Sequence, residues 1–254
     1  MYYSVCLPAV LRDRHPEEAL AAVAAAGFSH YEIWGWWNQD PDAYESAQKK
    51  WGFCVEAMCT RMISLTDPAC RPAYLEGLRE TVEVCRRLGC KTIISQVGAE
   101  LPGVERKLQH ESIVEGLKAC LPILEEANMT LVIEPLNTRI DHKGYYLWSS
   151  KEAFEIVDQV GDGHVKVLYD LYHQYVMEDL DVAEIRANIE KIGHFHMAGY
   201  PGRHEPMTES EVDYPTILKA IRESGYQYCV GMEYLPVQKP EESLQSLWKQ
   251  LLAI

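Results

Sequence analysis

The segment LVIEPLN, residues 131–137, sets the interpretation of the whole chain. Its first three residues are apolar and predict a buried strand. Glu134 stands where that strand ends, because Pro135 lacks the N–H group that a strand needs to continue its hydrogen bonds. A carboxylate at the end of a buried strand is costly unless a cation meets it. The segment therefore predicts a cationic group or a metal ion beside Glu134.

Strand-like and helix-like segments alternate along the chain. Besides the opening segment, strands are expected at residues 1–7, 30–34, 53–60, 91–98, 165–173, 192–199 and 228–234. Helices are expected at residues 15–26, 42–50 and 72–88, from about residue 111, at 149–160, 181–191 and 214–224, and from about residue 240. Eight strands alternating with helices predict an α/β fold, a (β/α)8 TIM barrel, as a single domain over residues 1–254. A doubly wound open sheet is the alternative, but its GxGxxG turn is absent after the first strand.

The composition excludes several classes of partner. The formal net charge is -14, from 38 acidic and 24 basic residues, and such a surface repels nucleic acid and anionic membranes. No apolar run approaches the roughly 18 residues of a membrane span. The first residues, MYYSVCLPAV, lack the basic and long apolar regions of a signal peptide. The eight cysteines form no CxxC pair, so we expect free thiols and a cytoplasmic protein.

Polar residues stand at the ends of four consecutive predicted strands. In a TIM barrel the active site lies at the carboxyl ends of the strands, so these side chains should converge on one point. Three carboxylates and one imidazole suit a divalent metal ion such as Mn²⁺, Mg²⁺ or Co²⁺. Any one of the four could instead be an ordinary loop hydrogen-bonding group. Their common register favours a metal site, with the ligands Glu134, Asp170, His196 and Glu233.

Three residues near these strand ends are candidates for substrate binding. His173 follows Asp170 by three residues and could donate a hydrogen bond to a substrate oxygen. Arg203 lies in the loop PGRHEP and could bind a carboxylate or a hydroxyl group, or form an ordinary salt bridge within the loop. His204 could be a second substrate contact or could serve only to order the loop.

Aromatic and acidic residues on the early strands are harder to interpret. Trp34, with Trp36 and Trp37 after it, follows the second strand, and these rings either wall a substrate pocket or pack the top of the barrel. We count Trp34 among the candidate substrate contacts. Glu32 and Glu56 lie within predicted strands and could be polar contacts in the core, which the sequence alone does not decide.

Six segments between residues 129 and 234 are distinctive: IEPLNTR, GYYLWSS, VLYDLYHQ, IGHFHMAGYPGRHEP, VDYPTILKAI and GMEY. Together they resemble hydroxypyruvate isomerase and its sugar isomerase/epimerase relatives, which belong to the xylose isomerase-like barrels. The resemblance implies a divalent metal held by the four residues named above. It also implies that Glu134 and Glu233 are the acid/base pair, and that His173 and Arg203 bind the substrate.

Two positions depart from the pattern of this family. Many hydroxypyruvate isomerases have glutamine at the position of His196, where ketose 3-epimerases have histidine. Those epimerases carry a further glutamate six residues after the position of Glu134, and this chain has Ile140 there. The resemblance thus implies an isomerase of a small hydroxy-carbonyl substrate, hydroxypyruvate-like, 2-oxo-acid-like or ketose-like, that moves a proton through an enediolate. A ketose 3-epimerase with the same metal site is the alternative.

Two other classes share this barrel. A non-catalytic sugar-binding homologue would keep the fold without the chemistry, although the complete set of ligands argues against it. Apurinic-site endonucleases need a trinuclear zinc cluster with histidines from earlier strands, and residues 53–60 and 91–98 contain none. No nucleotide-binding motif is present, so we expect no nucleotide cofactor. The expected partner is a small molecule, and a homo-oligomer stays open.

Overall fold

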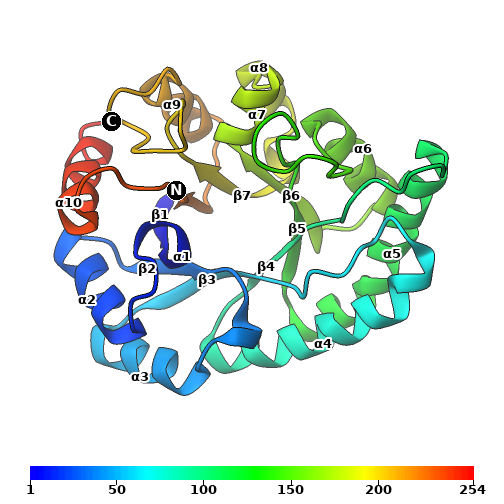
Figure 1. The fold of residues 1–254 in the computed structure, drawn as a ribbon, viewed down its shortest axis with the longest axis horizontal. Coiled ribbons are helices and arrows are strands. Elements are labelled where there is room, and N and C mark those ends of the chain that lie inside the picture. Colours follow the sequence, from blue (N-terminus) through cyan, green and yellow to red (C-terminus); the bar gives the residue numbers. More distant parts are fainter.

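Eight parallel strands form a closed barrel in the computed structural model, which describes residues 1–254. Each strand pairs with the next one along the chain, and the eighth pairs with the first, so the ring in Figure 1 follows the order of the sequence. The strands are β1 (Tyr2–Cys6), β2 (His30–Ile33), β3 (Cys54–Cys59), β4 (Thr92–Ser95), β5 (Thr130–Ile133), β6 (Val165–Asp170), β7 (Ile192–Met197) and β8 (Cys229–Met232). The predicted (β/α)8 barrel is confirmed.

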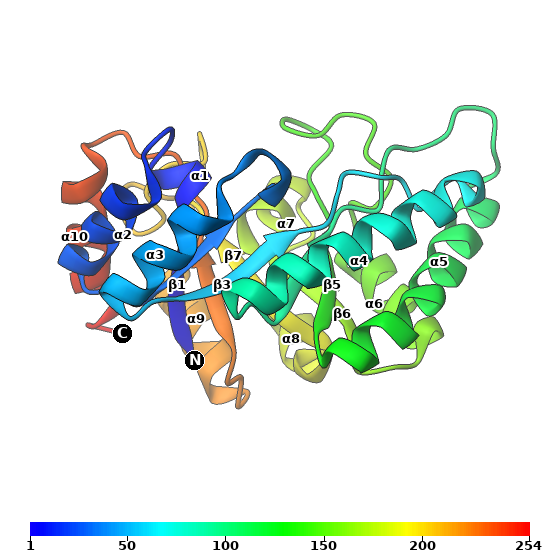
Figure 2. The ribbon, with the colours of Figure 1, turned by 90° about the horizontal axis from the view of Figure 1, so that it is seen from below.

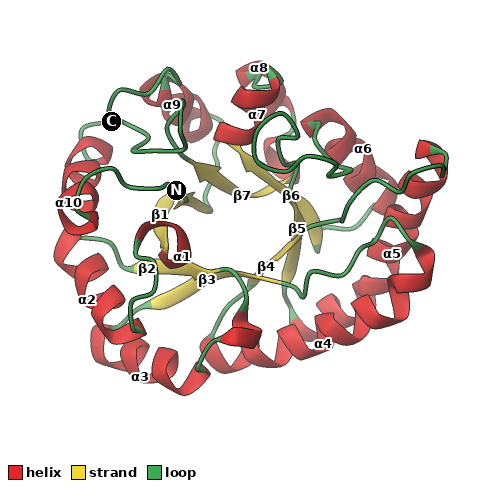
Figure 3. Ribbon diagram, in the orientation of Figure 1, coloured by secondary structure: helices red, strands yellow, loops and turns green.

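Helices form an outer ring around the strands, as the secondary-structure colours of Figure 3 show. The longer helices are α2 (Pro16–Ala26), α3 (Pro41–Trp51), α4 (Arg71–Leu88), α5 (Arg106–Ala127), α6 (Ser150–Val160), α9 (Tyr214–Glu223) and α10 (Pro240–Leu251). The shorter ones are α1 (Leu7–Val10), α7 (Leu171–Met177), α8 (Val182–Ala187) and the 3₁₀ turns η1 (Trp36–Asn38), η2 (Pro68–Cys70) and η3 (Ile189–Lys191). None of these helices is long and apolar enough to span a membrane.

The predicted sixth strand, residues 165–173, is too long. It ends at Asp170, whose Oδ1 accepts the backbone N–H groups of Tyr172 (2.8 Å) and His173 (3.0 Å). An aspartate that accepts these groups starts a helix, so His173 lies in the first turn of α7 and not on the strand. The helix expected at 181–191 divides into α8 and η3, and the one expected from residue 111 already begins at Arg106.

Two groups of side chains fill the inside of the barrel below its carboxyl end. The apolar cluster comes from β3 to β6 and consists of Ala57, Cys59, Ile94, Val132 and Leu168. The polar cluster comes from β1, β2, β7 and β8 and consists of Ser4, Glu32, His194, His196 and Cys229, all buried. A much larger apolar core lies between the strands and the helices.

The carboxyl ends of the strands open on one side of the barrel. In Figure 2, β1 runs from the N-terminus up to α1, and the long loops after β4 and β5 rise on the same side as α1. The candidate site residues follow β5 to β8 at this end. All eight cysteines are free, in agreement with the expectation from their spacing.

Candidate active site

A cavity of about 490 Å³ opens among the loops at the carboxyl end of the barrel. The predicted residues Trp34, Glu134, His173, Arg203 and Glu233 all line it, and so does His196. Its remaining wall is largely apolar. Arg203 is the only lysine or arginine that lines the cavity, so one fixed positive charge faces a group of carboxylates.

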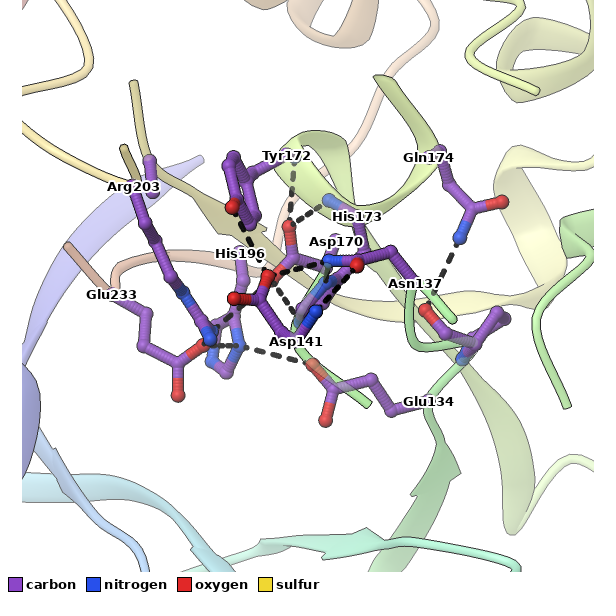
Figure 4. Close-up of polar contacts among 12 residues, drawn as sticks. Glu134, Asn137, Asp141, Asp170, Tyr172, His173, Gln174, His196, Arg203 and Glu233 are labelled. Atoms are coloured by element: carbon purple, nitrogen blue, oxygen red, sulfur yellow. Dashed lines mark hydrogen bonds and ion pairs between the residues drawn. The ribbon is translucent and has the colours of Figure 1, made fainter. Parts of the chain in front are cut away.

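The four predicted metal ligands converge at the floor of this cavity. One ligand atom each from Glu134, Asp170, His196 and Glu233 can be chosen so that all lie within 4.8 Å of one another. His196 Nδ1 lies 3.6 Å from Glu134 Oε1 and 3.4 Å from Glu233 Oε2. Figure 4 shows the two glutamates reaching toward this ring from opposite sides.

These residues fit a divalent cation by two criteria. Glu134 Oε1 and His196 Nδ1 are buried and have no hydrogen-bond partner, although buried polar atoms are normally paired. The three buried carboxylates face one guanidinium, that of Arg203, which leaves about two negative charges to be balanced. Oxygen ligands with one imidazole suit Mg²⁺, Mn²⁺ or a similar ion better than a thiolate-selective one.

Glu32 determines which nitrogen of His196 faces the cluster. Glu32 Oε2 accepts from His196 Nε2 at 2.8 Å, and a carboxylate can only accept, so this nitrogen carries the proton. The lone pair of neutral His196 is then on Nδ1, which points toward Glu134 and Glu233. A carboxylate behind a ligating imidazole is common in metal sites and fixes both its tautomer and its orientation.

Gly231 allows Glu32 and His196 to approach each other. A Cβ at this position would lie 2.2 Å from Glu32 Oε1 and 2.7 Å from His196 Cδ2. Both distances are too short for any side chain, so a residue with a Cβ would displace one of the two groups. The pairing of β7 with β8 places His196 beside Gly231.

The carboxylates and His196 shift one another's protonation. Burial opposes the charged form of Glu233, but Arg203 and His196 hold its pKa well below the ordinary value. For Asp170 burial prevails, and its pKa is raised. Burial also opposes the imidazolium, but Glu233 and Glu32 hold the pKa of His196 well above its ordinary value. A cation and a proton would therefore compete for His196 Nδ1.

The two candidate acid/base residues have different hydrogen-bond partners. Glu233 Oε1 accepts from Trp34 Nε1 at 2.6 Å, and its Oε2 pairs with Arg203. Glu134 Oε2 accepts from Gln96 Nε2 at 3.3 Å, while its Oε1 is unpaired. Glu233 is thus held by two nitrogen donors, one of them charged, and by a weaker contact from Cys6 Sγ at 3.8 Å, whereas Glu134 has one weak donor and a free oxygen facing His196.

His173 is buried at the edge of the cavity. Burial, together with the charge of Arg203, lowers the pKa of His173 to about 3, so the imidazole is neutral near pH 7. Its Nδ1 lies 2.7 Å from Asn137 Nδ2, and its Nε2 has no hydrogen-bond partner. Nε2 lies 3.6 Å from Asp170 Oδ2, beyond hydrogen-bond distance.

The loop after β7 is fixed to the segment after β8. The backbone N–H of Leu235 donates to Arg203 O at 2.7 Å, and the buried Glu205 accepts the N–H of Val237 at 3.0 Å. His204 is exposed, contacts Leu235 O through Nδ1 at 2.9 Å and does not line the cavity. This contact orders the loop, and the structure offers no geometry for the predicted substrate contact of His204.

The tryptophans after β2 separate in the structure. Trp34 lines the cavity, whereas Trp36 donates to Thr81 Oγ1 at 3.1 Å outside it and packs against Trp37. Glu56 is paired with Tyr2 and is not part of the site. The sequence pattern does not indicate Gln96 or Asn137, and it leaves Glu32 undecided.

Comparisons with known proteins agree with this architecture. A family model described as "Xylose isomerase-like TIM barrel" matches residues 20–250. Hydroxypyruvate isomerase of Escherichia coli is 33% identical over 181 residues, which are 70% of this chain and 69% of that protein. A 2-oxo-tetronate isomerase of Cupriavidus necator is 37% identical over 108 residues, 42% of this chain and 41% of that protein.

A solved structure matches almost the whole chain. The protein named "AP endonuclease, family 2" from Brucella melitensis superposes with a TM-score of 0.89, at 25% identity, over 96% of this chain and 97% of that one. The family model and the relative from E. coli together decide the family, and they confirm the resemblance found in the sequence. This chain belongs to the hydroxypyruvate isomerase family of xylose isomerase-like TIM barrels.

Proposed function

We propose that this protein is a divalent-metal-dependent isomerase of a small hydroxy-carbonyl substrate, such as hydroxypyruvate, another 2-oxo acid or a ketose. Relatives named hydroxypyruvate isomerase and 2-oxo-tetronate isomerase support an isomerase. The observation that carries the proposal is the position of Glu134 and Glu233, whose carboxylates flank His196 Nδ1 at 3.6 and 3.4 Å. Two carboxylates on either side of one point can remove a proton and return it.

The two glutamates are the proton carriers in this proposal. One carboxylate takes the proton from the carbon beside the carbonyl group, and the electron pair of the broken C–H bond enters an enediolate. A carboxylic acid then returns a proton to the former carbonyl carbon, and the proton of the original hydroxyl group moves to the former carbonyl oxygen, which completes the exchange of carbonyl and hydroxyl positions. Glu134, Asp170, His196 and Glu233 would hold the divalent cation, which when bound supplies Lewis acidity that stabilises the negative charge of the enediolate.

Arg203 and His173 are the proposed substrate contacts. Arg203 supplies the single fixed positive charge of the cavity wall and would pair with the carboxylate of a 2-oxo acid. Its backbone has a left-handed φ of 58°, an uncommon conformation for a residue with a side chain. Backbone strain of this kind is often found where a protein must aim a functional side chain.

Epimerisation is the second candidate, because a histidine at position 196 resembles the ketose 3-epimerases. The same glutamates would then return the proton to the opposite face of the carbon that lost it. The glutamate expected of those epimerases is absent. Its counterpart Ile140 is 53% exposed and lines a separate surface cavity, so no third carboxylate reaches the site from this position. Isomerisation is therefore the first choice.

Proton exchange in D₂O tests both candidates. The metal-loaded protein is incubated with hydroxypyruvate, 2-oxo-tetronate and ketoses of four to six carbons, and NMR locates the deuterium. Label on the carbon that becomes the new carbinol supports isomerisation, and label with inverted configuration at the original carbon supports epimerisation. If none of these substrates shows metal-dependent exchange, the proposal is wrong. Elemental analysis separates the other classes: one divalent ion is expected, three zinc ions would indicate a nuclease, and none a binding protein.

A further inference from the structure

Asn137, the last residue of the LVIEPLN segment, is fully buried, and both hydrogens and the oxygen of its side-chain amide have partners. Its Oδ1 accepts the backbone N–H groups of Ile140 at 3.1 Å and Asp141 at 3.0 Å. Its Nδ2 lies 2.6 Å from Asp141 Oδ2 and 2.7 Å from His173 Nδ1. Since backbone N–H groups can only donate, the oxygen must face them, and the orientation of the amide is not ambiguous.

This orientation determines the tautomer of His173. The amide nitrogen of Asn137 has two hydrogens, one for Asp141 and one for His173, and accepts nothing. His173 Nδ1 must therefore accept, and the single proton of the neutral ring is on Nε2. That nitrogen is buried, has no hydrogen-bond partner and belongs to a side chain that lines the cavity.

Asp141 holds Asn137 in place. Its Oδ2 accepts the hydroxyl of Tyr172 at 3.0 Å as well as the amide of Asn137. Figure 4 shows Asp141, Asn137 and His173 together on the side of Glu134 and Asp170, with Tyr172 above them. If the side-chain amide of Asn137 were reversed, its oxygen would face the carboxylate oxygen of Asp141, and two acceptors cannot form a hydrogen bond.

We propose that Asn137 is a positioning residue that presents His173 to the substrate as a neutral Nε2–H donor. A group of this kind binds an oxygen that accepts a hydrogen bond, namely a carbonyl oxygen or the oxygen of an enediolate. It leaves proton removal to the glutamates, because a protonated Nε2 has no free lone pair. The part that concerns the substrate rests on the proposed function, whereas the tautomer of His173 does not.

Histidine ¹⁵N NMR tests the tautomer without any substrate. Long-range ¹H–¹⁵N correlation spectra distinguish Nε2–H from Nδ1–H rings, and a His173→Gln variant identifies the His173 signals among the nine histidines. We expect an Nε2–H ring in the parent protein. In Asn137→Asp a carboxylate oxygen replaces the amide N–H, so His173 should become an Nδ1–H ring or be protonated on both nitrogens. Asn188→Asp, outside the cavity, is the control and should leave the ring unchanged.

Asn137→Leu provides a second test if the added charge unfolds the loop. It removes the donor without adding a carboxylate, and the His173 signals should then show a mixture of tautomers. An Nδ1–H ring in the parent protein, or an unchanged Nε2–H ring in both variants, overturns the proposal.

Kinetics distinguish positioning from a merely structural role. With a substrate found in the exchange panel, Asn137→Asp should lower kcat/KM by roughly 10²-fold, the usual effect of losing one donor to a developing oxyanion. In a His173→Gln background the same change should have almost no further effect, whereas a structural defect would persist. A protein with the expected tautomers but no exchange activity would refute the proposed function and leave only the control of the His173 tautomer by Asn137 intact.

Discussion

Below the candidate site, the apolar cluster and the polar cluster fill opposite parts of the barrel with different chemistry. The apolar cluster, from β3 to β6, contains no charged group. The polar cluster, from β1, β2, β7 and β8, buries a glutamate between two histidines, with Glu32 Oε1 at 3.1 Å from His194 and Oε2 at 2.8 Å from His196. The residues of both clusters are almost completely shielded from water, so solvent exposure does not explain why one cluster is apolar and the other is charged.

The comparison indicates that the two parts of the barrel serve different purposes. The apolar cluster stabilises the fold through buried area, at about 25 cal/mol per Å². Burial opposes the charge of Glu32, but His194 and His196 outweigh it and hold the pKa of Glu32 well below its ordinary value, so the buried carboxylate stays ionised. The polar cluster therefore supplies orientation, because the ionised Glu32 turns Nδ1 of His196 toward Glu134 and Glu233.

The largest expected effect tests whether proton transfer needs one glutamate from each of the two parts of the barrel. Glu134 follows β5 of the apolar cluster, and Glu233 follows β8 of the polar cluster. Glu134→Gln and Glu233→Gln should each lower the rate of substrate deuterium exchange by about 10³-fold, because each removes a proton carrier and a metal ligand. The measurement is NMR in D₂O with saturating metal.

Glu126→Gln is the control, because this exposed glutamate lies on α5 far from the cavity. It should keep the rate of the parent protein. Near-normal exchange in either active-site variant would show that the two-glutamate mechanism is wrong.

The second prediction compares one substitution in the polar cluster with one in the apolar cluster. Glu32→Gln should weaken divalent-metal binding by about 10- to 100-fold, since it removes the charge that orients His196. Val132→Ala in the apolar cluster should lower the free energy of unfolding by about 2 kcal/mol and leave metal affinity nearly unchanged. Chelator competition measures the affinity, and denaturant unfolding in EDTA measures the stability.

A different outcome would break the comparison. If Glu32→Gln binds metal as tightly as the parent protein and loses only stability, both clusters are packing elements. If Val132→Ala weakens metal binding as much as Glu32→Gln, the site depends on the rigidity of the whole barrel and not on one hydrogen bond.

Elements that depend on local pattern can be predicted from the sequence. Alternating strands and helices indicate the barrel, and polar residues at the ends of strands indicate Glu134, Asp170, His196 and Glu233. The end of β6 is predicted wrongly because Leu171, Tyr172 and His173 are as apolar and aromatic as the strand that precedes them. The signal for the true end is Asp170, a residue type that commonly starts a helix.

The supporting contacts cannot be predicted in this way, because they join residues far apart in the chain. Glu32 and His196 are separated by 164 positions and meet only because the closed barrel places them across its interior. Asn137 lies in the LVIEPLN segment, but its partner His173 is 36 positions away and on a helix that the pattern does not predict. The sequence pattern locates the residues at the strand ends. The residues that hold them in place come from distant parts of the chain and meet only when the barrel closes.

The smallest expected effect on metal binding comes from adding one methyl group between the members of the polar cluster. Alanine at position 231 would place a Cβ 2.2 Å from Glu32 Oε1, while alanine at position 163 would meet nothing within 4 Å. Gly231→Ala should lower the free energy of unfolding by about 1–3 kcal/mol, as overpacking does, and weaken metal binding only severalfold. The affinity loss is smaller than for Glu32→Gln because the carboxylate remains and only its position changes. Gly163→Ala should change neither quantity, and equal effects of the two substitutions would mean that close approach at Gly231 is unimportant.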